Sequence, residues 1–157
     1  MLADRIEIAI SRAKREQGFV ALCYLDLDGF KQVNDRMGHD AGDHLLREIA
    51  QRLLKVVRIN DTVARLGGDE FVVLFNGLKE PEDSVEGLRR LLQTIETPVL
   101  IQRELAQVSA SVGVAFFPKD GAYPDTLLRH ADIAMYQAKQ SGRSRYHFYD
   151  YAMHRNI

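Results

Sequence analysis

Two acidic residues follow a pair of glycines in the segment RLGGDEF, residues 65–71. Apolar runs on both sides predict two strands joined by a tight turn, and Gly67 and Gly68 suit that turn because glycine reaches positive φ without steric cost. Adjacent like charges repel, and acids are poor strand formers. Asp69 and Glu70 therefore indicate a cation site or a reaction, the alternative being a solvated turn with accidental acids.

A second acidic pair, Asp26 and Asp28, ends the nearly all-apolar run 19–25. Such a run predicts a strand buried on both faces in the middle of a sheet. Strand alternation places the two acids on one face and Leu27 on the other. Carboxylates at the end of a rigid central strand can hold a cation in a cleft, whereas the alternative is that they only begin a polar loop.

Helices and further strands must position these residues. Asp40 is the expected N-cap of one long helix, and Gly18 and Gly142 are expected to close two others. Helical and strand patterns alternate with hairpins among them, which predicts an α+β fold with one sheet covered by helices. Helices are expected over 3–17, 40–57, from 81 onward and over 123–141, and strands over 62–64, 71–75, 98–101, 105–115 and 146–148.

Composition limits the class of protein. With 157 residues, 46% hydrophobic and 27% charged, the chain is expected to form a single globular domain. A net charge of −1 argues against a nucleic-acid-binding face, and the apolar runs are too short to cross a membrane. Cys23 is the only cysteine, so no internal disulfide is possible and a reducing, cytoplasmic location is expected.

Taken together, the motifs resemble the GGDEF family of diguanylate cyclases, in register from about residue 2 to 148. The resemblance implies a palm-like fold, as in nucleotide cyclases and polymerases, with a central mixed, largely antiparallel sheet flanked by helices. The matching segments are DLDGFK at 26–31, ND at 34–35, GH at 38–39, GD at 42–43, RLGGDEF at 65–71, SVGVA at 111–115 and YQAKQSGR at 136–143.

The resemblance also implies an activity, the condensation of two GTP molecules into cyclic di-GMP with release of two pyrophosphates. The reaction would need Mg²⁺ or Mn²⁺, held by the Asp26 carboxylate, the Leu27 carbonyl and the Asp69 carboxylate. Asp69 is also the family's candidate base, with Glu70 beside it as a second metal or hydroxyl contact. Which of the two takes the proton stays open.

The same resemblance assigns the substrate contacts. Lys31 would stabilise charge in the transition state, and Lys139 and Arg143 would bind phosphates. Asn34 and Asp43 match the guanine-reading positions, where an amide and a carboxylate suit the donor and acceptor edge of guanine. Asp43 near a helix start and Lys139 near a helix end would also be favoured by the helix dipole alone.

An inhibitory product site is implied at Arg58 and Asp61, because five residues separate Asp61 from Gly67 as in the family. Arg89, with Arg90 as the alternative, would add a second cation. A cyclic di-GMP molecule bound there would slow a reaction that needs a homodimer of facing domains. An ordinary solvated turn between a helix and a strand is the competing reading of Arg58 and Asp61.

The resemblance also bears on the parent protein. A segment usual in the family just before residue 2 is missing, so residues 1–157 are expected to be a single domain of a longer multidomain protein. Residues 146–150 with Met153 are similar to the junction that precedes a phosphodiesterase domain. The alternative functions are therefore a GTP-binding regulatory module or a cyclic di-GMP receptor that controls such a neighbour, although the intact catalytic residue types favour the enzyme.

Overall fold

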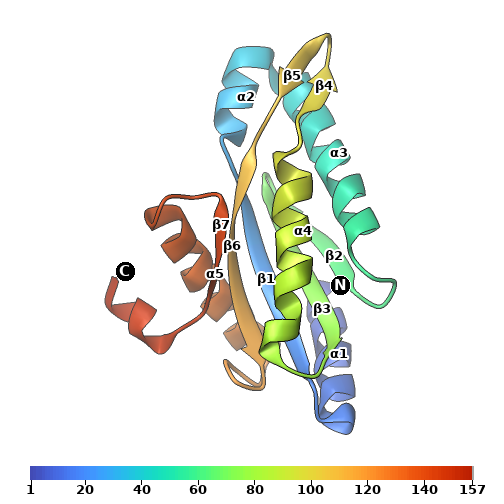
Figure 1. Ribbon diagram of the computed structural model, residues 1–157, viewed down its shortest axis with the longest axis vertical. Helices are drawn as coiled ribbons and strands as arrows, with labels where there is room; N and C mark the ends of the chain where they lie inside the picture. Colours follow the sequence, from blue (N-terminus) through green and yellow to red (C-terminus); the bar gives the residue numbers. More distant parts are fainter. Residues whose placement is uncertain (157) are drawn as a thin grey trace.

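A five-stranded sheet forms the centre of the protein, seen in a computed structural model that describes residues 1–156 and the side chains of 1–154 (Figure 1). Its strand order is β2-β3-β1-β6-β7, and every neighbouring pair is antiparallel except β6 and β7. The expected mixed, largely antiparallel sheet is thus confirmed. The strands are β1 (Phe19–Asp28), β2 (Thr62–Gly67), β3 (Glu70–Leu78), β6 (Ser109–Phe117) and β7 (Arg145–Phe148).

Helices flank this sheet, and a small separate hairpin lies at one end of the molecule (Figure 1). None of the helices in the described part of the chain has the length and apolar character needed to cross a membrane. The helices are α1 (Leu2–Glu16), α2 (Phe30–Met37), α3 (His39–Val56), α4 (Val85–Glu96) and α5 (Pro124–Gln140), with 3-10 turns at Pro81–Ser84 and Tyr151–Asn156; the hairpin is β4 (Val99–Ile101) and β5 (Glu104–Ala106).

Two apolar clusters, one on each face of the sheet, hold the helices in place. On one face, Cys23 and Leu25 of β1 pack in a cluster with the apolar residues of α3 and α4. On the other face, Val20 and Leu22 pack with residues of α1 and α5. Because alternate residues share a face, Asp26 lies on the same side of the sheet as α5, and Lys139 of α5 reaches it.

Two expected helix boundaries are wrong for local reasons. Gln17, not Gly18, takes the left-handed conformation that ends α1, with φ of 55°. Gly18 is required for a different reason, because a Cβ there would lie 2.8 Å from the carbonyl oxygen of Leu78. Helix α3 begins at His39 after Gly38, so Asp40 is inside the first turn and makes no side-chain cap.

The expected strand over residues 105–115 is also wrong as a single element. Residues 104–106 pair with β4 in the small hairpin, and the long strand β6 begins only at Ser109. This break lets the hairpin leave the main sheet beside α2, where Arg36 forms an ion pair with Glu104. The final edge strand is confirmed as β7, which lies parallel to β6.

Candidate functional site

The acidic residues of the two motifs meet at the end of β1. Because β1 and β3 are antiparallel, Asp26 lies opposite Glu70 in the register. The backbone N–H of Leu27 donates to the carbonyl oxygen of Asp69 at 3.1 Å, which ties the β2–β3 turn to the central strand. Gly68 has φ of 50°, so the predicted glycine turn is confirmed.

An open cavity of about 510 Å³ lies at this end of the sheet. The N-terminus of α2 forms part of its wall, and a helix N-terminus favours phosphate groups because its free N–H donors and dipole point at the ligand. The cavity thus places carboxylates against cations and a helix start. Its lining residues are Asp26, Leu27, Gly29, Phe30, Lys31, Gln32, Asp69, Lys139 and Arg143.

The carboxylates crowd one another. Burial raises the pKa of Asp26 to about 6; the nearby Lys139 opposes this rise, and the charges of Asp69 and Glu70 add to it. Lys139 Nζ lies 3.6 Å from Asp26 Oδ2. The carboxylates of Asp26, Asp69 and Glu70 therefore repel one another at the end of β1, which is the electrostatic condition that a divalent cation relieves.

The donor set fits magnesium. Among the described residues no three His, Cys, Asp or Glu side chains are grouped so that they could hold a metal ion by themselves. The metal ligands that the family resemblance implies are the Asp26 and Asp69 carboxylates and the Leu27 carbonyl; these residues line the cavity, and water would complete the coordination. All of these are oxygen ligands, and Mg²⁺ is commonly bound through one or two carboxylates and its retained waters.

Tyr24 is a residue of this site that the sequence analysis missed. Its hydroxyl donates to Glu70 Oε1 at 3.1 Å, and this bond orients the second acid of the turn. Burial, followed by the charge of Glu70, raises the pKa of Tyr24, so the phenol stays a neutral donor. Its place two residues before Asp26, on the same strand face, is the signal that could have revealed it.

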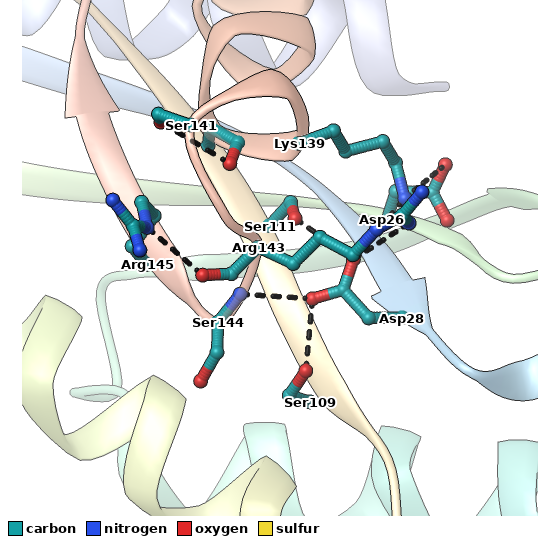
Figure 2. Close-up of polar contacts among 10 residues, drawn as sticks. Asp26, Asp28, Ser109, Ser111, Lys139, Ser141, Arg143, Ser144 and Arg145 are labelled. Carbon is teal, nitrogen blue, oxygen red and sulfur yellow. Dashed lines mark hydrogen bonds and ion pairs between the residues drawn. The ribbon is translucent and has the colours of Figure 1, made fainter.

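Asp28 does not line the cavity, but it forms ion pairs with two of the cations that do, Lys139 and Arg143. Figure 2 shows Lys139 between Asp26 and Asp28, with Arg143 on the same side. Burial on its own would raise the pKa of Asp28, but hydrogen bonds from Ser111 and other donors outweigh it and hold that pKa below its usual value. Asp28 is therefore an ionised, buried partner of the predicted phosphate ligands.

The predicted guanine-reading residues, Asn34 and Asp43, lie on α2 and α3 and are not among the residues that line the cavity. Asn34 follows Lys31 by three residues on α2, and its Oδ1 is buried without a hydrogen-bond partner among the described residues. Gly42 on α3 permits this position, since a Cβ there would fall 1.7 Å from Asn34 Oδ1. Asp43 is exposed beside it. A buried amide oxygen without a partner is costly, which favours a ligand donor at this point.

Arg58 and Asp61 lie elsewhere, on a cavity of about 340 Å³. The Asp61 side chain is only 1% exposed and accepts hydrogen bonds from the backbone N–H groups of Arg58 and Asn76, at 3.0 and 2.9 Å. This carboxylate therefore already has a structural role in the turn before β2. Of the two arginines considered on α4, Arg90 rather than Arg89 is among the residues that line the cavity.

Comparisons with known proteins agree with this architecture. The model of the family described as "Diguanylate cyclase, GGDEF domain" matches residues 1–145. The bifunctional diguanylate cyclase/cyclic di-GMP phosphodiesterase MucR of Pseudomonas aeruginosa is 46% identical over 156 residues, which cover 99% of this chain and 23% of MucR. The chain thus spans about a quarter or less of the length of its first curated relatives.

Solved structures give the same result. The isolated GGDEF domain of TpbB (YfiN) from Pseudomonas aeruginosa superposes with a TM-score of 0.94 at 33% identity, covering 99% of this chain and 91% of that one. The GGDEF domain of DgcB from Caulobacter crescentus, solved in complex with c-di-GMP, has a TM-score of 0.80 at 27% identity and covers 92% of this chain and 86% of that one. From its motifs, its fold and these matches, the chain belongs to the GGDEF family of diguanylate cyclase domains.

Proposed function

We propose that this domain is a diguanylate cyclase that joins two GTP molecules into cyclic di-GMP and releases two pyrophosphates. The observation that carries the proposal is the cavity at the end of β1, where Asp26 and Asp69 face Lys31, Lys139 and Arg143. Carboxylates for a metal and cations for phosphates, set in one open cavity, are the groups that nucleotidyl transfer requires.

In each half-reaction a 3′-hydroxyl loses its proton and its oxygen attacks the α-phosphorus of another GTP, while the bond to the departing pyrophosphate breaks. Asp69, or Glu70 held by Tyr24, takes the proton. A metal held by Asp26, Leu27 and Asp69 would supply charge neutralisation at the phosphates.

The cations of the cavity bind the triphosphate and stabilise its negative charge. Lys31, in the first turn of α2, stabilises the charge that develops on the reacting phosphate, and Lys139 and Arg143 bind the rest of the triphosphate. Arginine binds phosphate oxygens through a planar fork, whereas lysine acts as a point charge. Lys139 and Arg143 can therefore bind the same triphosphate in two different ways.

One such cavity holds one GTP, although the product joins two. Two copies must therefore face each other about a two-fold axis so that each 3′-hydroxyl meets the other α-phosphate. The functional unit of the proposal is accordingly a homodimer.

Product analysis after incubation with GTP and Mg²⁺ tests the proposal directly. Cyclic di-GMP and pyrophosphate in a 1:2 ratio are expected from GTP, and no cyclic product from ATP. MucR is named as both a cyclase and a phosphodiesterase, and this favours a second candidate function for the present domain. The domain would then be a GTP-binding module that regulates a neighbouring phosphodiesterase domain. GTP that binds but is recovered unchanged would reject the cyclase and favour that module.

Gly42→Ala is expected to weaken guanine recognition at a small cost in stability. The new Cβ would overlap Asn34 Oδ1, at 1.7 Å, and force the amide away from its position. Loss of one such hydrogen bond lowers GTP affinity by about tenfold at most, whereas the helix propensity of alanine, up to about 1 kcal/mol, offsets part of the cost of displacing the amide. Calorimetric titration with GTP and thermal unfolding measure the two effects.

Inorganic triphosphate, which lacks the base, is the control ligand for Gly42→Ala, and its affinity should not change. Unchanged GTP affinity in a correctly folded variant would remove Asn34 from the guanine site.

We further propose that the cavity lined by Arg58, Asp61 and Arg90 binds the product and that this binding slows the enzyme. The side chain of Arg58 is 63% exposed at this cavity, although its guanidinium also contacts Asp61 and the carbonyl of Asn76, and Arg90 supplies a second cation from α4. Arginine forks suit the guanine O6 and N7 atoms or a phosphate. The c-di-GMP complex of DgcB supports a product-binding capacity in the family.

Arg58→Ala is expected to leave early GTP turnover unchanged and to relieve the later slowdown as product accumulates. Removing a charge-assisted contact should weaken cyclic di-GMP binding by about tenfold or more. Arg89→Ala is the matched control, because Arg89 is an exposed arginine of the same helix outside the lining of this cavity. Calorimetry that gives equal cyclic di-GMP affinity for wild type and Arg58→Ala would reject the inhibitory site.

A further inference from the structure

The Asp28 carboxylate is anchored by neutral donors from the neighbouring strand. Ser111 Oγ donates to its Oδ1 at 2.8 Å and Ser109 Oγ donates to its Oδ2 at 2.9 Å. Both serines lie on β6, which pairs with the end of β1. The side chain of Asp28 is only 6% exposed, so two strands of the sheet fix the position of this charge.

Two predicted phosphate ligands converge on this one carboxylate. Lys139 Nζ lies 3.2 Å from Asp28 Oδ1, and Arg143 Nη1 lies 3.7 Å from the same oxygen (Figure 2). The two cations come from the last turn of α5 and from the segment that follows it. Like charges repel, so Lys139 and Arg143 need a shared anion to stay side by side while no phosphate is bound.

Asp28 also holds the turn from which Arg143 projects. Arg143 and Ser144 are consecutive non-glycine residues with φ of 63° and 51°, a left-handed conformation that such residues rarely adopt. The backbone N–H of Ser144 donates to Asp28 Oδ2 at 3.1 Å. This bond stabilises the strained turn and thereby sets where the guanidinium of Arg143 can reach.

We propose that Asp28 is the positioning residue of the triphosphate site, holding Lys139 and Arg143 together at the cavity before GTP arrives. The inference rests on the proposed function and goes beyond it, because Asp28 is not among the residues that line the cavity and would act through Lys139 and Arg143. Ser109, Ser111 and the Ser144 N–H donate hydrogen bonds to the Asp28 carboxylate and so stabilise part of its negative charge. The two cations therefore keep most of their attraction for a phosphate. Preorganised cations lose less side-chain freedom on binding, which raises affinity.

The test is Asp28→Asn, titrated with Mg²⁺ and either GTP or inorganic triphosphate. Asparagine keeps the volume and one acceptor but loses the charge that pairs with the cations. The expected result is a dissociation constant raised about tenfold or more for both ligands, as for loss of a charge-assisted hydrogen bond. In turnover the effect should fall on KM more than on kcat, because the binding of phosphates is weakened in ground and transition states alike.

A double-mutant cycle separates positioning from general damage. If Asp28 acts through Arg143, then Asp28→Asn should cost much less affinity in an Arg143→Ala background than in wild type. Asp120→Asn is the matched control: it also removes a partly buried carboxylate that accepts a backbone N–H, from Phe116 at 2.8 Å, but it lines a different cavity. Triphosphate affinity should be unchanged in that control.

Several results would overturn the inference. Unchanged triphosphate affinity in Asp28→Asn would mean that the carboxylate has no effect on phosphate binding. Tighter binding would mean that the carboxylate competes with the phosphates for the two cations. Full additivity with Arg143→Ala, or an equal loss in Asp120→Asn, would also overturn it. If Asp28→Asn fails to fold, Ser109→Ala removes one anchor of the carboxylate, and a triphosphate dissociation constant equal to wild type would then count against positioning.

Failure of the proposed function has a different signature. Wild-type protein that binds inorganic triphosphate but not GTP would reject the cyclase, while loss of triphosphate binding in Asp28→Asn would still support the positioning role.

Discussion

Asp69→Asn is expected to reduce cyclic di-GMP formation by roughly a hundredfold or more, the size of effect that a general base contributes. The substitution removes a charged metal ligand and one of the two candidate bases in a single step. The fold should persist, because the bond that ties the turn to β1 uses the backbone carbonyl of residue 69 and not its side chain. Removing one of three crowded acids should leave the free energy of unfolding unchanged or slightly raised.

Initial rates with saturating GTP and Mg²⁺, together with thermal unfolding, measure this prediction. Glu70→Gln is the companion variant, since Glu70 is held by Tyr24 on the neighbouring strand. A larger loss of kcat in Glu70→Gln than in Asp69→Asn would identify Glu70 as the residue that takes the proton. Near wild-type product formation by Asp69→Asn would remove Asp69 from the site altogether.

Gly113→Ala should have the largest effect on stability. Helix α5 packs so closely on β6 that a Cβ at Gly113 would lie 2.0 Å from the carbonyl oxygen of Ala131 and 2.1 Å from the backbone nitrogen of Met135. Backbone atoms in a helix cannot move alone, so the whole of α5 must shift. Overpacking of this kind costs about 3 kcal/mol or more, which corresponds to a loss of roughly 6–12 °C in melting temperature for a domain of this size.

A shift of α5 would also carry Lys139 away from the cavity, so GTP affinity should fall together with stability. Gly87→Ala is the matched control: its Cβ would lie 2.8 Å from Cζ at the tip of the Phe75 ring, a clash with the end of one side chain instead of with helix backbone. Urea or thermal unfolding of both variants measures the difference. A Gly113→Ala protein as stable as wild type would contradict the observed contact between α5 and β6.

The parts of the fold that the sequence predicted are those set by local patterns. The apolar run before Asp26 identified the central strand, and period-two alternation placed Asp26 and Asp28 correctly on one face. The glycine pair identified the β2–β3 turn, because a tight turn needs residues that can adopt positive φ, and Gly67 and Gly68 both do so. Local chemistry decides both features, so no knowledge of distant contacts was required.

Features set by distant contacts were not predictable in this way. Asp28 meets Ser109 and Ser144, which are 81 and 116 residues away along the chain, so its role in holding the cations appears only once β1, β6 and α5 are packed. The break before β6 depends on pairing with β4, and the apolar pattern continues across it. In both cases the tertiary partner, not the local sequence, decides the outcome.

Boundaries and loops show a further limit. Asp40 is a good N-cap residue by type, but Gly38 with φ of 95° already turns the chain into α3. The spacing of Arg58 and Asp61 matched a binding motif, whereas burial shows that Asp61 also holds its own turn together. A residue type therefore predicts what a side chain can do, and only its neighbours show which of those roles is occupied.

The most direct test of the account is the initial rate of cyclic di-GMP formation from GTP and Mg²⁺ over a wide range of protein concentration. If two facing copies each contribute one GTP, the rate per protein should rise with concentration until dimers dominate, and should vanish when the metal is chelated. A rate strictly proportional to protein concentration across the whole range would contradict the need for two facing domains. GTP binding with no cyclic di-GMP at any concentration would contradict the cyclase itself.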